Sequence, residues 1–139
     1  MSGGRLWASG LALGLAMACS NPAAPLISQL GQPVELGVGQ MAVYPDQELR
    51  ATFLAVPADS RCPSKVECIT AGDATVQVVL ATPSVPSAQV ELHTAVRGEA
   101  SAVYAGFTIE LLGLAPYPEQ PGTIPTNSYR ATLQIVPSP

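Results

Sequence analysis

Two cysteines in the middle of the chain, Cys62 and Cys68, have a spacing that suggests chemistry. Two nearby thiols can close a disulfide in an oxidising compartment or contribute to a metal site. A structural zinc ion needs four ligands, the interval between these cysteines is not that of a zinc finger, and the sequence has a single histidine, His93. We therefore expect a Cys62–Cys68 disulfide, worth roughly 2 kcal/mol of stability, and no metal.

Side chains suited to acid–base catalysis are scarce. Asp59 and Asp73 flank the cysteines and could converge as a glycosidase-like carboxylate pair, but a small domain without an aromatic-lined cleft has little to hold a sugar. We expect one of them to pair with Arg61 instead, at about 0 to 1 kcal/mol if the pair is exposed. His93 follows the polar residues of a strand and is expected in solvent. Gly-x-Ser-x-Gly, His-Glu-x-x-His and phosphate-binding glycine motifs are absent, so we expect neither catalytic residues nor a cofactor.

Two loops are candidates for binding. The cysteine loop carries Arg61 and Lys65, and a disulfide would hold this turn in one conformation before recognition. The other interpretation is that the disulfide only closes a loop over one end of the domain and that this loop contacts no partner. Residues 115–128 form the second loop, in which Tyr117 stands between two prolines. Tyr117 could anchor a partner or cap the core.

The N-terminus is typical of an export signal. A single positive charge at Arg5 precedes an uncharged apolar stretch over residues 6–18, which is shorter than the roughly 20 residues that cross a bilayer. Residues 15–19, Leu-Ala-Met-Ala-Cys, resemble the lipobox of bacterial lipoproteins, although Ala16 stands where leucine is commonest. The resemblance implies that Cys19 is lipidated and anchors the protein to a membrane of the cell envelope. The alternative is an ordinary secretory signal that leaves Cys19 as a free thiol.

Length and composition limit the remaining possibilities. The 139 residues are enough for one small domain, and we divide them into a signal peptide (1–18), a lipidated cysteine with a flexible tether (19–33) and a single domain (34–139). The 6 Lys and Arg against 10 Asp and Glu leave no basic surface for nucleic acid. The hydrophobic content of 47% is sufficient for a buried core rather than a disordered chain.

Hydrophobic residues alternate with polar ones at the period of a β-strand, and no amphipathic helix follows residue 20. Prolines and glycines separate the runs, and the proline-rich breaks cannot continue a central strand. The sequence predicts an all-β, antiparallel, immunoglobulin-like sandwich of about seven strands, with a small β-barrel as the alternative. The expected strands are residues 34–38, 41–44, 49–56, 75–80, 89–93, 107–111 and 129–135.

The region around the cysteines resembles a group of uncharacterised bacterial lipoproteins. Their motif has the form DSRCPxxVxCxWAG and is followed by a strand; the matching residues here are Asp59, Ser60, Arg61, Cys62, Pro63, Val66, Cys68, Ala71 and Gly72. Thr70 replaces the tryptophan of that motif. The likeness continues at residues 106–112, 116–118 and 129–131, so it covers most of the domain. It implies a small exported β domain and no particular activity.

Two functional hypotheses follow. In the first, the protein is a lipid-anchored structural or interaction module of the bacterial envelope, whose loops contact an unknown envelope protein. In the second, it inhibits an exported protease by presenting the Cys62–Cys68 loop, with Arg61 or Lys65 as the specificity residue. An enzyme is the least favoured interpretation.

Overall fold

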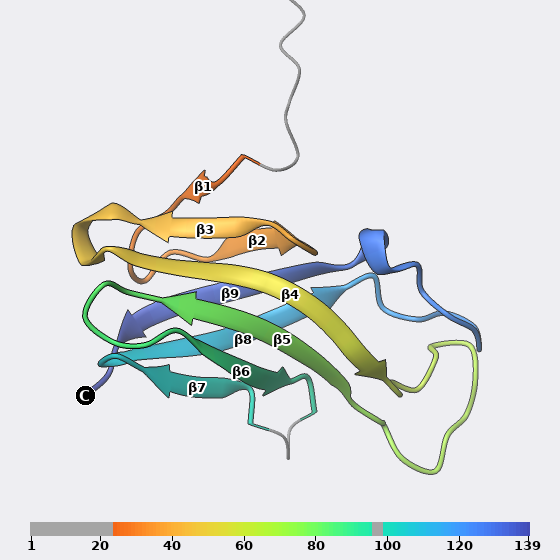
Figure 1. Ribbon diagram of the computed structural model, residues 1–139. Coiled ribbons are helices and arrows are strands. Elements are labelled where there is room, and N and C mark those ends of the chain that lie inside the picture. Colours follow the sequence, from red (N-terminus) through yellow and green to blue (C-terminus); the bar gives the residue numbers. More distant parts are fainter. Residues whose placement is uncertain (1–23, 96–98) are drawn as a thin grey trace, which may run out of the picture.

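The computed structural model in Figure 1 describes residues 24–95 and 99–139. The expected signal peptide and the expected lipid attachment at Cys19 lie outside these residues. Within the described part, we find no helix that is long and apolar enough to cross a membrane. The only helices in these two ranges are the short 3-10 turns η1 (Pro45–Gln47) and η2 (Thr126–Ser128).

The described residues form two β-sheets. One sheet has five strands in the order β1-β3-β4-β5-β6, and the other has four in the order β2-β9-β8-β7. The strands are β1 (Leu26–Ile27), β2 (Val34–Gly37), β3 (Met41–Tyr44), β4 (Leu49–Asp59), β5 (Ala74–Ala81), β6 (Ala88–His93), β7 (Ser101–Tyr104), β8 (Phe107–Ala115) and β9 (Arg130–Pro137).

The core lies between the two sheets and follows the alternation of the sequence. On β5 every second side chain is buried, from Ala74 to Leu80, and the residues between them are partly exposed. On β9 the same alternation buries Leu133 and Ile135 completely. Each large apolar side chain removed from water in this way stabilises the fold by about 1.5 to 3 kcal/mol. The expected two-layer, sandwich-like β fold is confirmed, and the two sheets do not close into the alternative barrel.

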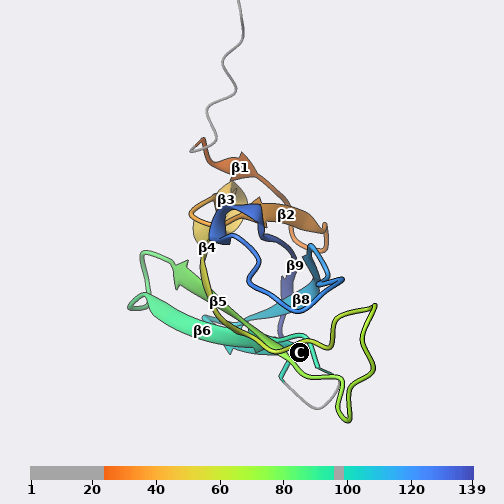
Figure 2. The same cartoon turned by 90° about the vertical axis from the view of Figure 1, so that its right-hand side faces the viewer.

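Strands that are consecutive in sequence lie side by side in each sheet. β3 to β6 form one meander, β7 to β9 form another, and β2 pairs with β9. The chain changes sheets between β1 and β2, between β2 and β3, and again between β6 and β7, and the end view in Figure 2 shows the two layers that result. An immunoglobulin-like domain divides its strands into the sheets ABED and CFG, so that B pairs with E and C pairs with F, whereas among the described strands only β1–β3 and β2–β9 join strands that are not consecutive. The order found here is therefore not the immunoglobulin-like order expected from the sequence.

Two strands were not expected. The first, β1, lies in the segment predicted as a flexible tether (19–33), where it runs parallel to β3. Further along that segment, the N–H of Gly31 donates to the carbonyl of Ile135 at 2.8 Å. The C-terminal part of the expected tether is thus bonded to the domain.

The second unexpected strand, β7, forms a hairpin with β8. Its two turn residues, Ala105 and Gly106, have φ values of 50° and 82°. Positive φ at both central residues is the geometry of a type I′ turn, whose twist matches that of the paired strands. Alanine is uncommon there, so the sequence carried little signal for this hairpin.

Candidate functional site

The cysteine loop extends the β4–β5 hairpin beyond its two strands. The Ser60 N–H donates to the Asp73 carbonyl at 2.7 Å, and the Cys62 N–H donates to the Ala71 carbonyl at 2.8 Å. Further out, the expected Cys62–Cys68 disulfide is confirmed, with the Cα atoms 6.0 Å apart. We call residues 60–73 the stapled loop.

Arg61 lies at the base of the stapled loop and is buried, with 7% of its surface exposed. Its Nε and Nη2 donate to the two carboxylate oxygens of Asp59, at 2.9 and 2.7 Å. Its Nη1 donates to the Leu114 carbonyl at 2.8 Å, and Nη2 also reaches the Pro116 carbonyl at 3.0 Å. Because Asp59 ends β4 and Leu114 lies on β8, this one side chain joins the two sheets. The expected pairing of Arg61 with one of the two aspartates is confirmed, with Asp59 as the partner. Because the pair is buried, Arg61 is not exposed to recognise a partner, as the binding-loop hypothesis had expected.

Tyr129 completes the polar cluster around Asp59. Its hydroxyl donates to Asp59 Oδ2 at 2.9 Å. Burial by itself would raise the pKa of the Asp59 carboxyl, but hydrogen bonds from Arg61 and Tyr129, together with the guanidinium charge, bring it below its ordinary value. Burial, and then the hydrogen bond to the Asp59 carboxylate and its charge, raise the pKa of Tyr129 to about 12.

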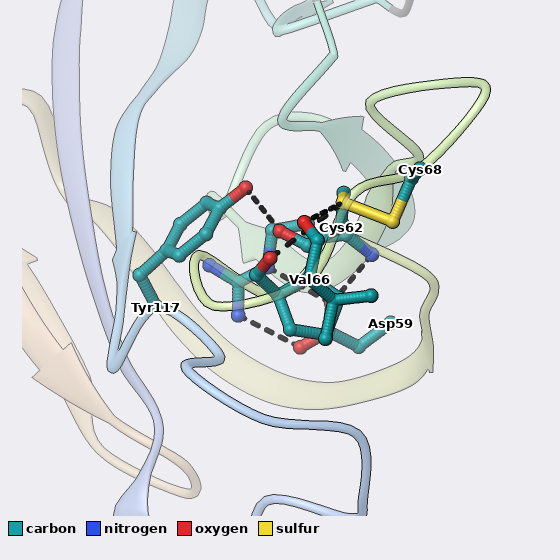
Figure 3. Close-up of a disulfide and its surroundings, with 7 residues drawn as sticks. Asp59, Cys62, Val66, Cys68 and Tyr117 are labelled. Atoms are coloured by element: carbon teal, nitrogen blue, oxygen red, sulfur yellow. Dashed lines mark hydrogen bonds and ion pairs between the residues drawn. A yellow bond between two sulfur atoms is a disulfide. The ribbon is translucent and has the colours of Figure 1, made fainter.

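Tyr117 connects the second expected binding loop to the first. Figure 3 shows its side chain directed at the Cys62 end of the stapled loop, where its hydroxyl donates to the Cys62 carbonyl at 2.8 Å. The ring centroid lies 5.2 Å from Cζ of Arg61, within the range of a cation–π contact. Tyr117 nevertheless remains 53% exposed, so it borders the site rather than the core.

Backbone hydrogen bonds join the same two loops further out. The N–H groups of Ser64 and Lys65 donate to the carbonyls of Pro118 and Glu119, both at 3.0 Å. The Lys65 Nζ lies 3.2 Å from a Glu119 carboxylate oxygen, and both side chains are largely exposed. The two candidate binding loops therefore form one surface at one end of the sandwich (Figure 1), and the two basic residues of the stapled loop are each paired with an acid.

Asp73 and His93 form a second polar cluster, on the other side of the stapled loop. The Nδ1 of His93 lies 2.6 Å from Asp73 Oδ2, while Asp73 Oδ1 accepts from the N–H groups of Thr94 and Ala95, both at 2.9 Å. Burial alone would raise the pKa of Asp73, but the hydrogen bonds from His93, Ala95 and Thr94 hold it below its ordinary value. His93 lies on a strand, at the end of β6, as expected, but only about a third of its side chain is exposed and Asp73 fixes its ring, so it is not the freely solvated residue that was expected.

A cleft of about 750 Å³ lies between these two clusters. It is bounded by the end of β6, by the part of β8 beyond Leu111, and by residues 70–72 of the stapled loop. Thr70 is one of the lining residues. Asp59 and Asp73 have separate hydrogen-bond partners, so no joint carboxylate site forms. Within residues 24–95 and 99–139, we also find no group of three or more potential metal ligands.

Apolar side chains are exposed along the same end of the domain. Ile69, near the tip of the stapled loop, is fully exposed, and Val66 is 39% exposed. Leu112 of β8, which lines the cleft, is half exposed. Such residues cost free energy in water and are typical of contact surfaces when they cluster.

The chain matches no protein-family model, no curated protein and no solved structure. Its candidate site therefore rests on geometry alone.

Proposed function

We propose that the protein is a lipid-anchored, non-catalytic module of the bacterial cell envelope, and that its stapled end binds an envelope protein. The lipobox-like residues 15–19 support an anchor at Cys19. Three restraints support a binding role for the stapled end: the disulfide, the Arg61 hydrogen bonds and the backbone pairing with residues 118–119. A surface that is ordered before it meets its partner loses less conformational entropy on binding.

The observation that carries the proposal is the exposure of Ile69 on this restrained loop. A β-branched apolar side chain with its whole surface in water contributes nothing to the core of the domain. Cys68 of the disulfide directly precedes Ile69, so the covalent link restrains the backbone that carries this side chain, and Val66 lies inside the same closed ring. Apolar anchors of this kind, held centrally in a rigid surface, provide much of the binding energy at protein interfaces.

Site-specific photo-cross-linking in the expressing bacterium tests this role. Benzoylphenylalanine in place of Ile69 is expected to give one covalent adduct with an envelope protein. The matched control is the same substitution at Val103, which is 69% exposed but lies on β7. Adducts from neither position, or the same adducts from both, would contradict the proposal. Removing both Cys62 and Cys68 is expected to weaken the adduct at position 69.

The protease-inhibitor hypothesis keeps one observation in its favour. Lys65 stands on the stapled loop with 61% of its side chain exposed, whereas buried Arg61 is not positioned to enter a protease cleft. If the domain is an inhibitor, it lowers the activity of trypsin-like proteases and Lys65→Ala abolishes the effect. No inhibition across a panel of such proteases rejects this second candidate.

A further inference from the structure

The cleft beside the stapled loop exists because β7 covers only part of β8. Pairing between them ends at Ser101 and Glu110, while β8 continues to Ala115. Beyond that point the sheet edge borders the cleft, and a register shift between Leu111 and Gly113 interrupts its regular pairing with β9. The volume of about 750 Å³ is within the range of small-molecule sites.

The walls of the cleft are largely apolar. Leu111, Leu112 and Leu114 line it from β8, and Ala71 and Ala95 line it from the opposite side. The aromatic ring of Tyr117 borders one end. These residues would enclose the body of an apolar molecule.

The polar side chains in the lining include Thr70, Thr94 and His93, and the ring of His93 is held by Asp73. Nδ1 of His93 lies 2.6 Å from Asp73 Oδ2, and an ionised carboxylate can only accept, so we assign the proton to Nδ1, whose N–H donates to Asp73. In a neutral imidazole, a protonated Nδ1 leaves Nε2 as the acceptor. Nε2 forms no hydrogen bond with any residue in the described ranges, and His93 lines the cleft.

Among the described residues, the charges that border the cleft are already paired. Arg61 lies against Asp59, and Asp73 lies against His93 and two backbone N–H groups. A charged ligand would lose its hydration without meeting an unpaired opposite charge among the described lining residues, which is unfavourable.

We propose that this cleft binds a neutral, largely apolar small molecule with one hydroxyl or N–H group, which donates a hydrogen bond to Nε2 of His93. Val66 and Ile69 are not among the residues that line the cleft, and the site does not depend on the proposed protein partner. Its ligand is recognised by shape, by contact with the leucines of β8 and by a single donor.

Two rigid probes of nearly equal size test the donor requirement at pH 8. 2-Naphthol carries a hydroxyl, and 2-methoxynaphthalene carries a methyl ether that cannot donate. Titrations followed by ¹H–¹⁵N NMR of the oxidised domain are expected to shift the amides of Thr94, Ala95 and Gly113, with 2-naphthol binding about three- to tenfold tighter. Equal affinities, no binding of either probe, or shifts confined to another surface would overturn the proposal.

Three variants locate the interaction. His93→Leu is expected to remove the preference for 2-naphthol, and retention of that preference would overturn the assignment of Nε2. Gly113→Leu is expected to weaken the binding of both probes. A Cβ at Gly113 meets no atom within 4 Å, so the longer leucine side chain can occupy the cleft. Val103→Ala, on β7 and away from the cleft, is the control and leaves both affinities unchanged.

Asp73→Asn gives a readout that a purely structural role for Asp73 would not produce. The side-chain oxygen of the asparagine can still accept hydrogen bonds from the N–H groups of Thr94 and Ala95. Its NH₂ group donates to Nδ1 of His93, so the ring proton moves to Nε2. The ¹⁵N chemical shifts of the His93 ring are expected to report the other tautomer, and the preference for 2-naphthol is expected to be lost. An unchanged tautomer with an unchanged preference contradicts the proposed role of Asp73.

Discussion

The guanidinium of Arg61 lies against the carboxylate of Asp59 with two parallel hydrogen bonds, of 2.9 and 2.7 Å, where the two sheets meet. Only 5% of the Arg61 side chain and 12% of the Asp59 side chain are exposed. Removing one member of a buried pair leaves the other charge without compensation, which costs about 3 to 5 kcal/mol. We infer that this pair fixes the stapled end against β8.

Arg61→Ala should therefore be strongly destabilising. It leaves Asp59 unpaired and removes the donor from two carbonyls, so we expect a loss of about 3 kcal/mol in urea unfolding. Arg61→Lys should recover only part of this, because an ammonium group cannot make the paired bonds of a guanidinium. Lys65→Ala, on the same loop but in an exposed pair, is expected to cost less than about 1 kcal/mol. Equal effects of Arg61→Ala and Lys65→Ala would contradict this role.

The stability of the domain should fall in acid through Asp59. Its pKa is depressed in the folded state, so its contribution is present above the unfolded value of about 3.9 and is lost as the pH falls through the folded value. Asp59→Asn is expected to cost more stability at pH 7 than at pH 2. Asp46→Asn, on the exposed η1 turn, is the control. A cost for Asp59→Asn that is the same at both pH values would rule out this linkage.

The raised pKa of Tyr129 predicts a second loss of stability, at alkaline pH. Its folded pKa is about 12 and its ordinary value is 10, so its contribution is complete below pH 10 and disappears as the pH rises through about 12. The free energy of unfolding of the parent, measured by chemical denaturation, should fall across this pH interval. Tyr129→Phe should make that fall with pH less steep. An identical slope in the variant would show that Tyr129 ionisation is not linked to unfolding.

Gly72 should tolerate no side chain. Its φ is +69°, and a Cβ there would overlap the Ser60 carbonyl oxygen. Gly31 is a matched comparison, because its φ is +78° but a Cβ meets nothing within 4 Å. We expect Gly31→Ala to cost about 1 to 2 kcal/mol from the backbone conformation alone. Gly72→Ala should cost at least about 1 kcal/mol more, since the loop backbone must also move; similar losses in thermal unfolding would contradict the overlap.

The sequence predicted the strands better than their connections. Alternation identifies the buried residues of β5 and β9, because period-two burial is a local property. Alternation does not determine which strands become neighbours, so the meander order could not be predicted from it. The four residues of β7 were missed because the run is short and its turn begins with Ala105, which has no preference for positive φ.

The site was predicted in part, for a similar reason. The Cys62–Cys68 disulfide followed from the local spacing and the expected compartment. Arg61 was expected in solvent because a charged residue in a polar loop usually is. Its burial depends on the Leu114 carbonyl, which is distant in sequence. Asp73 and His93 meet only when β5 pairs with β6, and strand pairing of this kind was the one available signal for their contact.

The most direct test of the account is the intact mass of the full-length protein recovered from the membrane fraction of an expressing bacterium, with and without reductant. We expect a species that begins at Cys19, carries a diacylglyceryl group and is lighter by two hydrogens than its reduced form. That result would establish an exported, anchored and disulfide-closed module. A soluble, unlipidated protein with free thiols at Cys62 and Cys68 would contradict the account.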